Sequence, residues 1–211
     1  MRVVAVTGGI GCGKSAATEI FSELGVKVVD VDVISHALTS HQLTGEHSFI
    51  LKEISAHFGA DILDETGALK RAQLRNVIFK DATKRHLLES ILHPAIYKQA
   101  SLEIIKNTQH DCKLGYQILA IPLLSAASNY YNLIDHTVVI DCNESLQISR
   151  TIARSQLSEI EVKAIINNQI SREQRLKLAD DVIENEGNLA ELRKKIELFH
   201  EKYINTCIVR K

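Results

Sequence analysis

The hydrophobic positions at the start of the chain predict a strand, a helix and a second strand. Residues 2–7 form a short apolar run rich in valine, which is typical of a fully buried strand in a parallel sheet. Apolar residues then recur at helical spacing from Ala17 to Leu24, and Gly25 follows where a C-terminal cap is expected. Residues 27–30 form the second strand, so this segment predicts a βαβ unit with a parallel sheet.

The stretch from Val33 to His110 predicts helices and no convincing strand. Residues 87–92 carry one apolar helical stripe, and residues 96–104 carry another. Pro94 lies between the two stripes. We therefore expect a helical insertion between the second and third strands.

Further strands are predicted where apolar runs return in the second half of the chain. They cover residues 116–121, 137–141 and 181–183, and a C-terminal helix with an apolar face follows from Leu189. Before the last strand, residues 144–180 have a polar, helical pattern. The expected fold is an α/β protein with a five-stranded parallel sheet flanked by helices and with two helical excursions.

A glycine-rich turn connects the first strand to the first helix, and its sequence carries a specific chemistry. Residues 8–15 match the pattern G-x-x-x-x-G-K-[ST] completely. Glycines allow consecutive backbone N–H groups to turn around a phosphate, and the following helix points its positive N-terminus at the same group. Lys14 can reach the β- and γ-phosphate oxygens, and the Ser15 hydroxyl can coordinate Mg²⁺. The residues expected at the nucleotide phosphates are Gly9, Gly11, Cys12, Gly13, Lys14, Ser15 and Ala16.

Two other uses of a glycine turn fit the sequence less well. A dinucleotide site also places a glycine turn before a helix, with an acidic residue such as Asp30 at the end of the second strand. Its pattern is G-x-G-x-x-G, whereas the glycines here are spaced G-x-G-x-G, and Lys14 and Ser15 have no role in it. A guanine-reading N-K-x-D is absent from the sequence, which argues against a GTPase.

Two carboxylates follow the second strand, at the sheet edge where ligands of open α/β sheets bind. Asp32 can accept a proton from a substrate hydroxyl or orient that hydroxyl for in-line attack. The alternative for Asp32 is to cap the helix that starts at Val33. Asp30 can contact a metal-bound water or orient the residues that contact the ligand directly.

Basic residues gather in the polar segment after the fourth strand. Arg150 and Arg154 are four residues apart and share one helix face, so they can close over a γ-phosphate; a solvated basic face is the alternative. Small P-loop kinases carry their lid at this point of the chain, which favours the first interpretation. Asp141 ends the fourth strand and resembles a Walker B carboxylate, with helix capping as an equal alternative.

Composition narrows the class of protein further. The 211 residues include 25 Lys and Arg and 26 Asp and Glu, for a formal net charge of −1, so there is no broad basic field for nucleic acid or a membrane surface. No apolar run approaches the length of a membrane span, and the N-terminal run is too short for a signal peptide. Four cysteines and nine histidines show no metal-ligand spacing, so we expect a reduced cytoplasmic protein without structural zinc.

Motifs along nearly the whole chain resemble those of the dephospho-CoA kinases. They comprise the phosphate loop, the pair of aspartates, a His-Pro pair in a predicted helix and a Pro-Leu-Leu sequence at the end of the third strand. Two later segments contain the basic residues and the last strand. The matching segments are residues 6–15, 29–34, 58–63, 92–96, 121–124, 169–176 and 179–187. Many enzymes share the phosphate loop, whereas this ordered set is specific to one family.

The resemblance implies ATP-dependent phosphorylation of the ribose 3′-hydroxyl of dephospho-CoA, the last step of coenzyme A synthesis, with Mg²⁺ beside ATP. It implies Asp32 as the base and Lys14 and Arg150 on the phosphates, and Arg154 completes the expected catalytic set. The residues expected to receive the acceptor are Asp32, His93, Pro94, Pro122 and Leu123. The resemblance also implies that Pro94 starts a helix of the acceptor domain and that Pro122 ends the third strand at the site.

The implied organisation is a P-loop kinase fold in three parts. Residues 1–32, 111–143 and 181–211 form the nucleotide-binding core. Residues 33–110 form a helical acceptor domain for dephospho-CoA, and residues 144–180 form a lid. We expect a monomer.

Two positions depart from the family pattern. Ala126 stands where a glutamate is usual shortly after P-L-L, which puts acceptor affinity in doubt, and Ala16 stands where Thr or Ser is common. Lys14, Ser15 and Asp32 are retained, so we expect an active enzyme. The open alternatives are a P-loop kinase for another alcohol, such as a nucleoside monophosphate, and a nucleotide-binding regulatory module that has lost catalysis.

Overall fold

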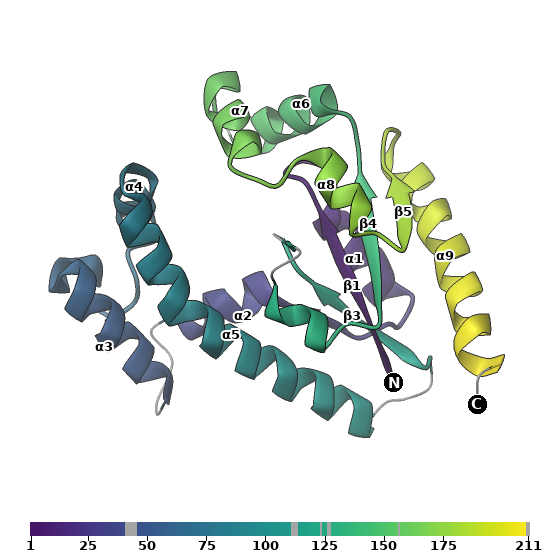
Figure 1. Ribbon diagram of the computed structural model, residues 1–211, viewed down its shortest axis with the longest axis horizontal. Coiled ribbons are helices and arrows are strands. Elements are labelled where there is room, and N and C mark those ends of the chain that lie inside the picture. The colour runs from purple at the N-terminus through teal and green to yellow at the C-terminus, as the bar shows by residue number, and fades with distance from the viewer. Residues whose placement is uncertain (41–45, 111–113, 123, 126–127, 156, 210–211) are drawn as a thin grey trace. The chain divides into compact units, whose positions relative to one another are not determined.

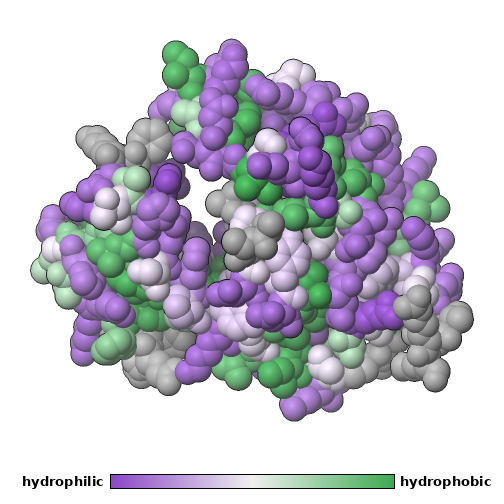
Figure 2. Space-filling model, in the orientation of Figure 1, coloured by the Kyte–Doolittle hydropathy of each residue, from purple (hydrophilic) through white to green (hydrophobic). Residues whose placement is uncertain are grey.

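The computed structural model describes residues 1–40, 46–110, 114–122, 124–125, 128–155 and 157–209 (Figure 1). They divide into two compact units, which are Val31–Leu102 and the remainder, Met1–Asp30 with Glu103–Lys211. No helix within these ranges is both long and apolar enough to cross a membrane. Hydrophilic residues dominate the face shown in Figure 2, and separate apolar patches interrupt them.

A five-stranded sheet organises the first unit, and all its strands run parallel. The strands are β1 (Arg2–Gly8), β2 (Val28–Asp30), β3 (Tyr116–Ala120), β4 (His136–Asp141) and β5 (Asp181–Glu184). Their order in the sheet is β2-β3-β1-β4-β5. Val4 pairs with Ile118 of β3, and Val6 pairs with Val138 of β4. β1 and β3 are buried along almost their whole length, which is why apolar residues predominate in both, although β3 also buries the polar side chain of Gln117. The predicted α/β class with five parallel strands is confirmed.

Helices α1 (Lys14–Glu23) and α9 (Leu189–Val209) pack on the same face of this sheet. Phe21 of α1 and Phe199 of α9 meet edge to face, with ring centroids 5.9 Å apart. Both rings belong to one buried cluster with alternate side chains of β1, β3 and β4. Because burial of aromatic and aliphatic side chains is the main stabilising contribution here, this cluster fixes α1 against the strand that precedes it.

Three short helices follow β4, as the polar helical pattern predicted. They are α6 (Glu144–Ser155), α7 (Glu159–Asn167) and α8 (Arg172–Lys177). Ser158 and Glu161 form a capping box at the start of α7, and Ser171 and Gln174 form another at the start of α8. Each box satisfies backbone N–H groups that a helix start leaves unpaired, so the sequence itself divides this segment into separate helices.

The second unit is helical, as predicted. Its elements are α2 (Val31–Leu38), α3 (Glu46–Phe58), the 3₁₀ helix η1 (Ala60–Ile62), α4 (Arg71–Lys80) and the first part of α5 (Ala82–His110). In the described part of this unit, β pairing is limited to one isolated bridge between Leu63 and Leu69. Asp64 holds the turn between them, because its Oδ1 accepts hydrogen bonds from the N–H groups of Thr66 and Ala68 at 2.9 and 3.0 Å.

Helix α5 corrects one expectation, because it continues through Pro94 instead of starting there. Pro94 lacks the N–H that would bond the carbonyl of Ser90. Both residues are exposed, so water can satisfy that carbonyl and the lost hydrogen bond is tolerated. The two apolar stripes predicted on either side of the proline therefore belong to a single helix.

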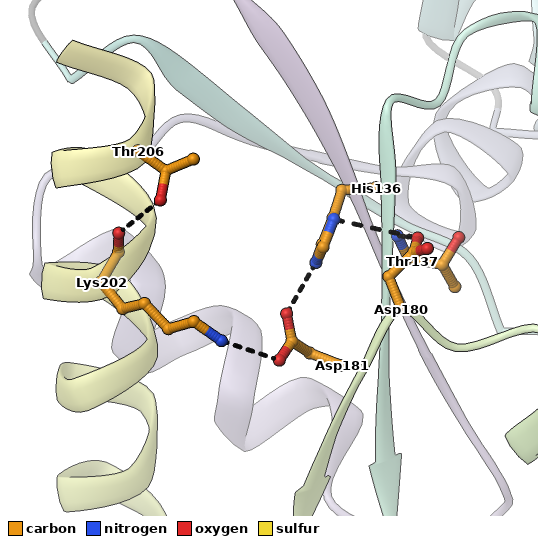
Figure 3. Close-up of polar contacts among 6 residues, drawn as sticks. All are labelled: His136, Thr137, Asp180, Asp181, Lys202 and Thr206. Carbon is orange, nitrogen blue, oxygen red and sulfur yellow. Dashed lines mark hydrogen bonds and ion pairs between the residues drawn. The ribbon is translucent and has the colours of Figure 1, made fainter. Parts of the chain in front are cut away.

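His136, at the amino end of β4, links β4 to β5 through side chains (Figure 3). Its Nε2 lies 2.8 Å from Oδ2 of Asp181 at the start of β5, and its Nδ1 lies 3.8 Å from Oδ2 of Asp180. Asp180 also accepts a hydrogen bond from the N–H of Thr137 at 2.7 Å. Lys202 of α9 reaches the other carboxylate oxygen of Asp181 at 3.3 Å. The edge strand β5 is therefore held by side-chain contacts as well as by its backbone hydrogen bonds to β4.

We expect His136→Ala to lower the free energy of unfolding by about 1.5–3 kcal/mol, because it removes a hydrogen bond to a carboxylate. The variant also loses the ring contact with Tyr203, whose centroid lies 5.1 Å away. Lys202→Ala is the matched control, because Lys202 contacts the same Asp181 from an exposed position, and exposed ion pairs contribute less than about 1 kcal/mol. Urea unfolding followed by circular dichroism measures both variants. Unchanged stability of His136→Ala would contradict this assignment.

Candidate active site

The phosphate loop, residues 8–15, joins β1 to α1 as the sequence predicted. Gly11 and Gly13 have φ angles of 75° and 93°, a region that residues with a Cβ rarely adopt. The N–H of Cys12 donates to the carbonyl of Gly9 at 3.1 Å and closes the loop. Among the described residues no side chain caps α1, and the positive end of this helix faces the loop.

Side chains from the helices after β4 pack closely on two of the loop glycines. A Cβ on Gly9 would collide with Nε2 of Gln147 and would lie 2.7 Å from Nη1 of Arg175. A Cβ on Gly11 would lie 2.5 Å from the carbonyl oxygen of Gln147, which is backbone and cannot move aside easily. Gly11 is therefore required by packing as well as by backbone conformation, whereas a Cβ at Gly9 would displace the ends of the Gln147 and Arg175 side chains.

Asn185, just after β5, connects the loop to two further elements. Its Nδ2 donates to the carbonyl of Cys12 at 2.8 Å and lies where a Cβ on Gly13 would have to be. Its N–H donates to the carbonyl of Asp141 at 2.7 Å, and its own carbonyl accepts from Nη1 of Arg150 at 2.8 Å. The end of β4, the end of β5 and α6 are thereby joined to the loop through one buried amide.

The segment that leads into α8 also contacts the loop. Oε1 of Gln169 accepts a hydrogen bond from the N–H of Ile10 at 3.2 Å. Arg175 is 6% exposed, and its Nη2 donates to the carbonyl of Ile170 at 3.1 Å. A buried guanidinium is thus fixed beside Gly9, where it contributes positive charge to the phosphate loop.

Lys14 and Asp30 lie together at the carboxyl edge of the sheet. Nζ of Lys14 is 3.9 Å from Oδ2 of Asp30, and the two side chains are 12% and 22% exposed. Asp30 is the last residue of β2 and pairs with Ala120 of β3, so the sheet fixes its backbone. The structure therefore brings together the lysine of the loop and the first of the two predicted carboxylates.

Asp32 lies in the first turn of α2, in the second unit, with an exposed side chain. The capping alternative required a helix that starts at Val33, but α2 starts at Val31, so Asp32 is inside the helix rather than before it. A carboxylate in the first turn interacts favourably with the helix dipole. The base role and the capping role of Asp32 both stay predictions.

Asp141 forms an ion pair with Arg172. It is 2% exposed, and its Oδ2 accepts from Nε and Nη2 of Arg172 at 2.9 and 2.6 Å. These hydrogen bonds and the carboxylate charge raise the pKa of the Arg172 guanidinium further above its usual range. The capping alternative for Asp141 is wrong, because the side chain that caps α6 is that of Asn143, whose Oδ1 accepts from the N–H of Leu146 at 2.9 Å.

The two arginines predicted on the lid differ in their surroundings. Arg150 donates from Nη1 and Nη2 to the carbonyls of Asn185 and Gly187, both at 2.8 Å. Arg154 lies in the last turn of α6 with an exposed side chain. Arg150 therefore holds the turn after β5 and is linked to the phosphate loop through Asn185. A direct contact of either arginine with phosphate stays a prediction.

The predicted acceptor residues are described in part. His93 and Pro94 are exposed on α5 in the second unit. Pro122 follows β3 and is half-buried, close in the chain to the carboxyl edge of the sheet. Leu123 and Ala126, the position of the missing glutamate, lie outside the described residues.

Sequence reasoning does not single out four residues that the structure brings to the loop. They are Gln147, Gln169, Arg175 and Asn185. Three of them fall within segments 169–176 and 179–187, so the family motifs held a signal that charge and spacing alone did not show. Gln147 is a single polar residue on a helix and has no comparable signal.

Comparison with known proteins identifies the relatives of this chain. A family model described as dephospho-CoA kinase matches residues 2–191. The dephospho-CoA kinase of Thiobacillus denitrificans is 44% identical over 210 residues, covering 100% of this chain and 99% of that protein. The dephospho-CoA kinase of Nitrosomonas europaea is 42% identical over 202 residues, covering 96% and 95%. Among solved structures, the dephospho-CoA kinase from Campylobacter jejuni superposes with a TM-score of 0.68 at 28% identity, covering 98% of this chain and 99% of that one.

We expect Gly11→Ala to raise the KM for ATP at least about tenfold, since displaced loop atoms weaken phosphate binding and misplacement by 1 Å can cost about 10²-fold. Gly25→Ala is the matched control, because Gly25 has a similar φ of 83° but its Cβ would meet only Leu114 Cδ1 at 3.9 Å. The control should lose about 1–2 kcal/mol of stability and keep its KM. Steady-state kinetics and thermal unfolding separate the two effects, and an unchanged KM in Gly11→Ala would refute the packing argument.

Proposed function

This chain belongs to the dephospho-CoA kinase family, and we propose how its residues transfer the γ-phosphoryl group of ATP to the ribose 3′-hydroxyl of dephospho-CoA. The family gives the reaction, which is the last step of coenzyme A synthesis, and the two substrates. The observation that carries the proposed residue roles is the phosphate loop packed under α6 and α8, with Lys14 beside Asp30.

The phosphate loop binds the ATP phosphates in this proposal. Its N–H groups and the positive end of α1 supply fixed dipoles, and Lys14 supplies a mobile charge. Nζ of Lys14 lies 3.9 Å from Asp30, which is longer than a hydrogen bond. A polyphosphate carries more charge than one carboxylate, so Lys14 is attracted to it more strongly than to Asp30. Arg175 adds a fixed positive charge beside Gly9.

Asp32 acts as the base in this proposal. The 3′-oxygen of dephospho-CoA forms a bond to the γ-phosphorus, the bond from that phosphorus to ADP breaks, and the 3′-hydroxyl proton passes to the Asp32 carboxylate. The position of Asp32 supports this role, since it follows Asp30, the last residue of β2, by two residues, and ligands of parallel sheets bind at the carboxyl ends of strands. Because phosphoryl transfer has a loose transition state, orienting the hydroxyl is as important as removing its proton.

Ser15 is the residue that we propose for Mg²⁺. It lies exposed in the first turn of α1, next to Lys14. Within the described ranges, no cluster of three or more His, Cys, Asp or Glu side chains could hold a metal by itself, and Asp141 is occupied by Arg172. This donor set fits an ion held largely by the phosphates with one protein hydroxyl, as Mg²⁺ commonly is. When bound with ATP, the ion supplies charge neutralisation at the β- and γ-oxygens.

The acceptor role of residues 33–110, the lid role of residues 144–180, the monomeric state, the absence of nucleic-acid partners and the cytoplasmic location stay predictions. The compact second unit, Val31–Leu102, supports a separate acceptor domain that covers most of the expected range.

Replacement of Asp32 by Asn should lower kcat by about 10²–10⁴-fold, because the amide cannot accept the hydroxyl proton, and should leave ATP affinity within about twofold. Lys14→Ala is the informative counterpart, since it should raise the KM for ATP while Asp32 remains intact. Coupled detection of ADP with titration of each substrate measures both. An Asp32→Asn variant that turns over at the normal rate would remove the base assignment.

Ser15→Ala should raise the Mg²⁺ concentration needed for half-maximal activity by about tenfold, since one oxygen ligand is lost. Ser22→Ala provides the control, because Ser22 is also an exposed serine on α1 but lies at the far end of the helix from the loop. A magnesium titration at fixed ATP distinguishes them. Identical curves for Ser15→Ala and Ser22→Ala would exclude Ser15 as a ligand.

A further inference from the structure

Two buried thiols face each other at the phosphate loop, one in the loop itself and one just after the end of β4. The proposed function uses neither thiol. Cys12 belongs to the loop and Cys142 follows β4, and their sulfur atoms are 3.1 Å apart. The residues are 0% and 1% exposed. Nε2 of Gln147 also donates to the sulfur of Cys12, at 3.0 Å. The Cys12 sulfur therefore accepts two hydrogen bonds in an enclosed site.

We propose that Cys12 and Cys142 form a reversible disulfide when a small peroxide reaches them, and that this disulfide switches off ATP binding. The Cys12 thiolate attacks one peroxide oxygen, an S–O bond forms, the O–O bond breaks, and the departing hydroxide takes a proton to become water. The sulfur of Cys142 then attacks the sulfenic sulfur of Cys12, and its proton leaves with the hydroxyl group as a second water. The two thiols lose two electrons in total, and the peroxide gains them.

The surroundings of the pair favour one thiolate and one thiol. The hydrogen bond from Cys142 lowers the pKa of Cys12 to about 7, and Gln147 and the charge of Arg175 act in the same direction against the effect of burial. The same hydrogen bond and burial raise the pKa of Cys142. Cys12 is therefore the nucleophile toward an oxidant, and Cys142 is the proton donor that resolves the sulfenic acid.

Closure of the disulfide would disturb the phosphate loop. An S–S bond is about 2.05 Å long, so the two sulfur atoms must approach by roughly 1 Å. The N–H of Cys12 is hydrogen-bonded to the carbonyl of Gly9, and the carbonyl of Cys12 accepts a hydrogen bond from the side chain of Asn185. A shift of Cys12 therefore moves the loop that binds phosphate. A displacement of about 1 Å at a reacting site can cost about 10²-fold in rate. The oxidised enzyme should accordingly bind ATP poorly.

The experiment treats the full-length enzyme with hydrogen peroxide and measures activity, ATP affinity and intact mass before and after dithiothreitol. We expect activity to fall at least about tenfold, the mass to fall by two hydrogens, and peptide mapping to join Cys12 to Cys142. Dithiothreitol should reverse all three changes. Because the cross-link is detected by mass, a failure of the proposed residue roles would not hide it.

Two variants isolate the pair. Cys142→Ser keeps a hydroxyl donor for Cys12 and normal activity in the absence of peroxide. Under peroxide, Cys12 of this variant should gain oxygen and form no cross-link. As oxidation continues beyond the sulfenic acid, dithiothreitol should no longer restore activity. The double variant Cys112→Ser with Cys207→Ser removes the other two cysteines and should respond like the unmodified enzyme.

Three results would overturn the proposal. One is an unmodified enzyme that forms no Cys12–Cys142 cross-link under peroxide. Another is a cross-linked enzyme that keeps its activity and its affinity for ATP. The third is a Cys142→Ser variant that is rescued by dithiothreitol as fully as the unmodified enzyme even after prolonged treatment with peroxide.

Discussion

The close packing of polar side chains on the glycines of the phosphate loop is the constraint on which the site depends. Gln147 and Arg175 occupy the space that a Cβ of Gly9 would take, and the backbone of Gln147 does the same at Gly11. Asn185 does so at Gly13 while it bonds the carbonyl of Cys12. The shape of the loop is therefore set by elements that lie far from it in the sequence, and those elements are held in turn by the parallel sheet.

This packing also accounts for how a nearly neutral chain can serve a polyphosphate substrate. The net charge of −1 describes the whole chain, whereas Lys14 and Arg175 concentrate positive charge at the loop. Asp141, which ends β4, is neutralised by Arg172, so its charge does not oppose the phosphates at full strength. Only the carboxylate is buried, since the side chain of Arg172 is 55% exposed, and the hydrogen bonds from Nε and Nη2 of Arg172 offset the cost of burying Asp141.

Local patterns in the sequence were enough to predict the strands, the phosphate loop and the helical second unit, because each depends on neighbouring residues. Pro94 was misinterpreted because its position in a helix depends on whether Ser90 is exposed, which the sequence does not reveal. The partners of Asp141 and Cys12 were not predictable, since Arg172, Asn185 and Cys142 reach them across the fold. Helix capping was one of two alternatives for Asp141, and it does not hold because α6 starts after Asn143, whose side chain caps it.

Membership of the dephospho-CoA kinase family means that this chain transfers the γ-phosphoryl group to one particular hydroxyl of dephospho-CoA. The most direct measurement is phosphorus NMR of the product formed from ATP, Mg²⁺ and dephospho-CoA, together with an assay of ADP release from an acceptor that lacks the 3′-hydroxyl. We expect coenzyme A phosphorylated at the 3′-position in equal amount to ADP, and no phosphorylated product from the 3′-deoxy acceptor. Phosphorylation of another hydroxyl, or equal turnover of the 3′-deoxy acceptor, would contradict this expectation.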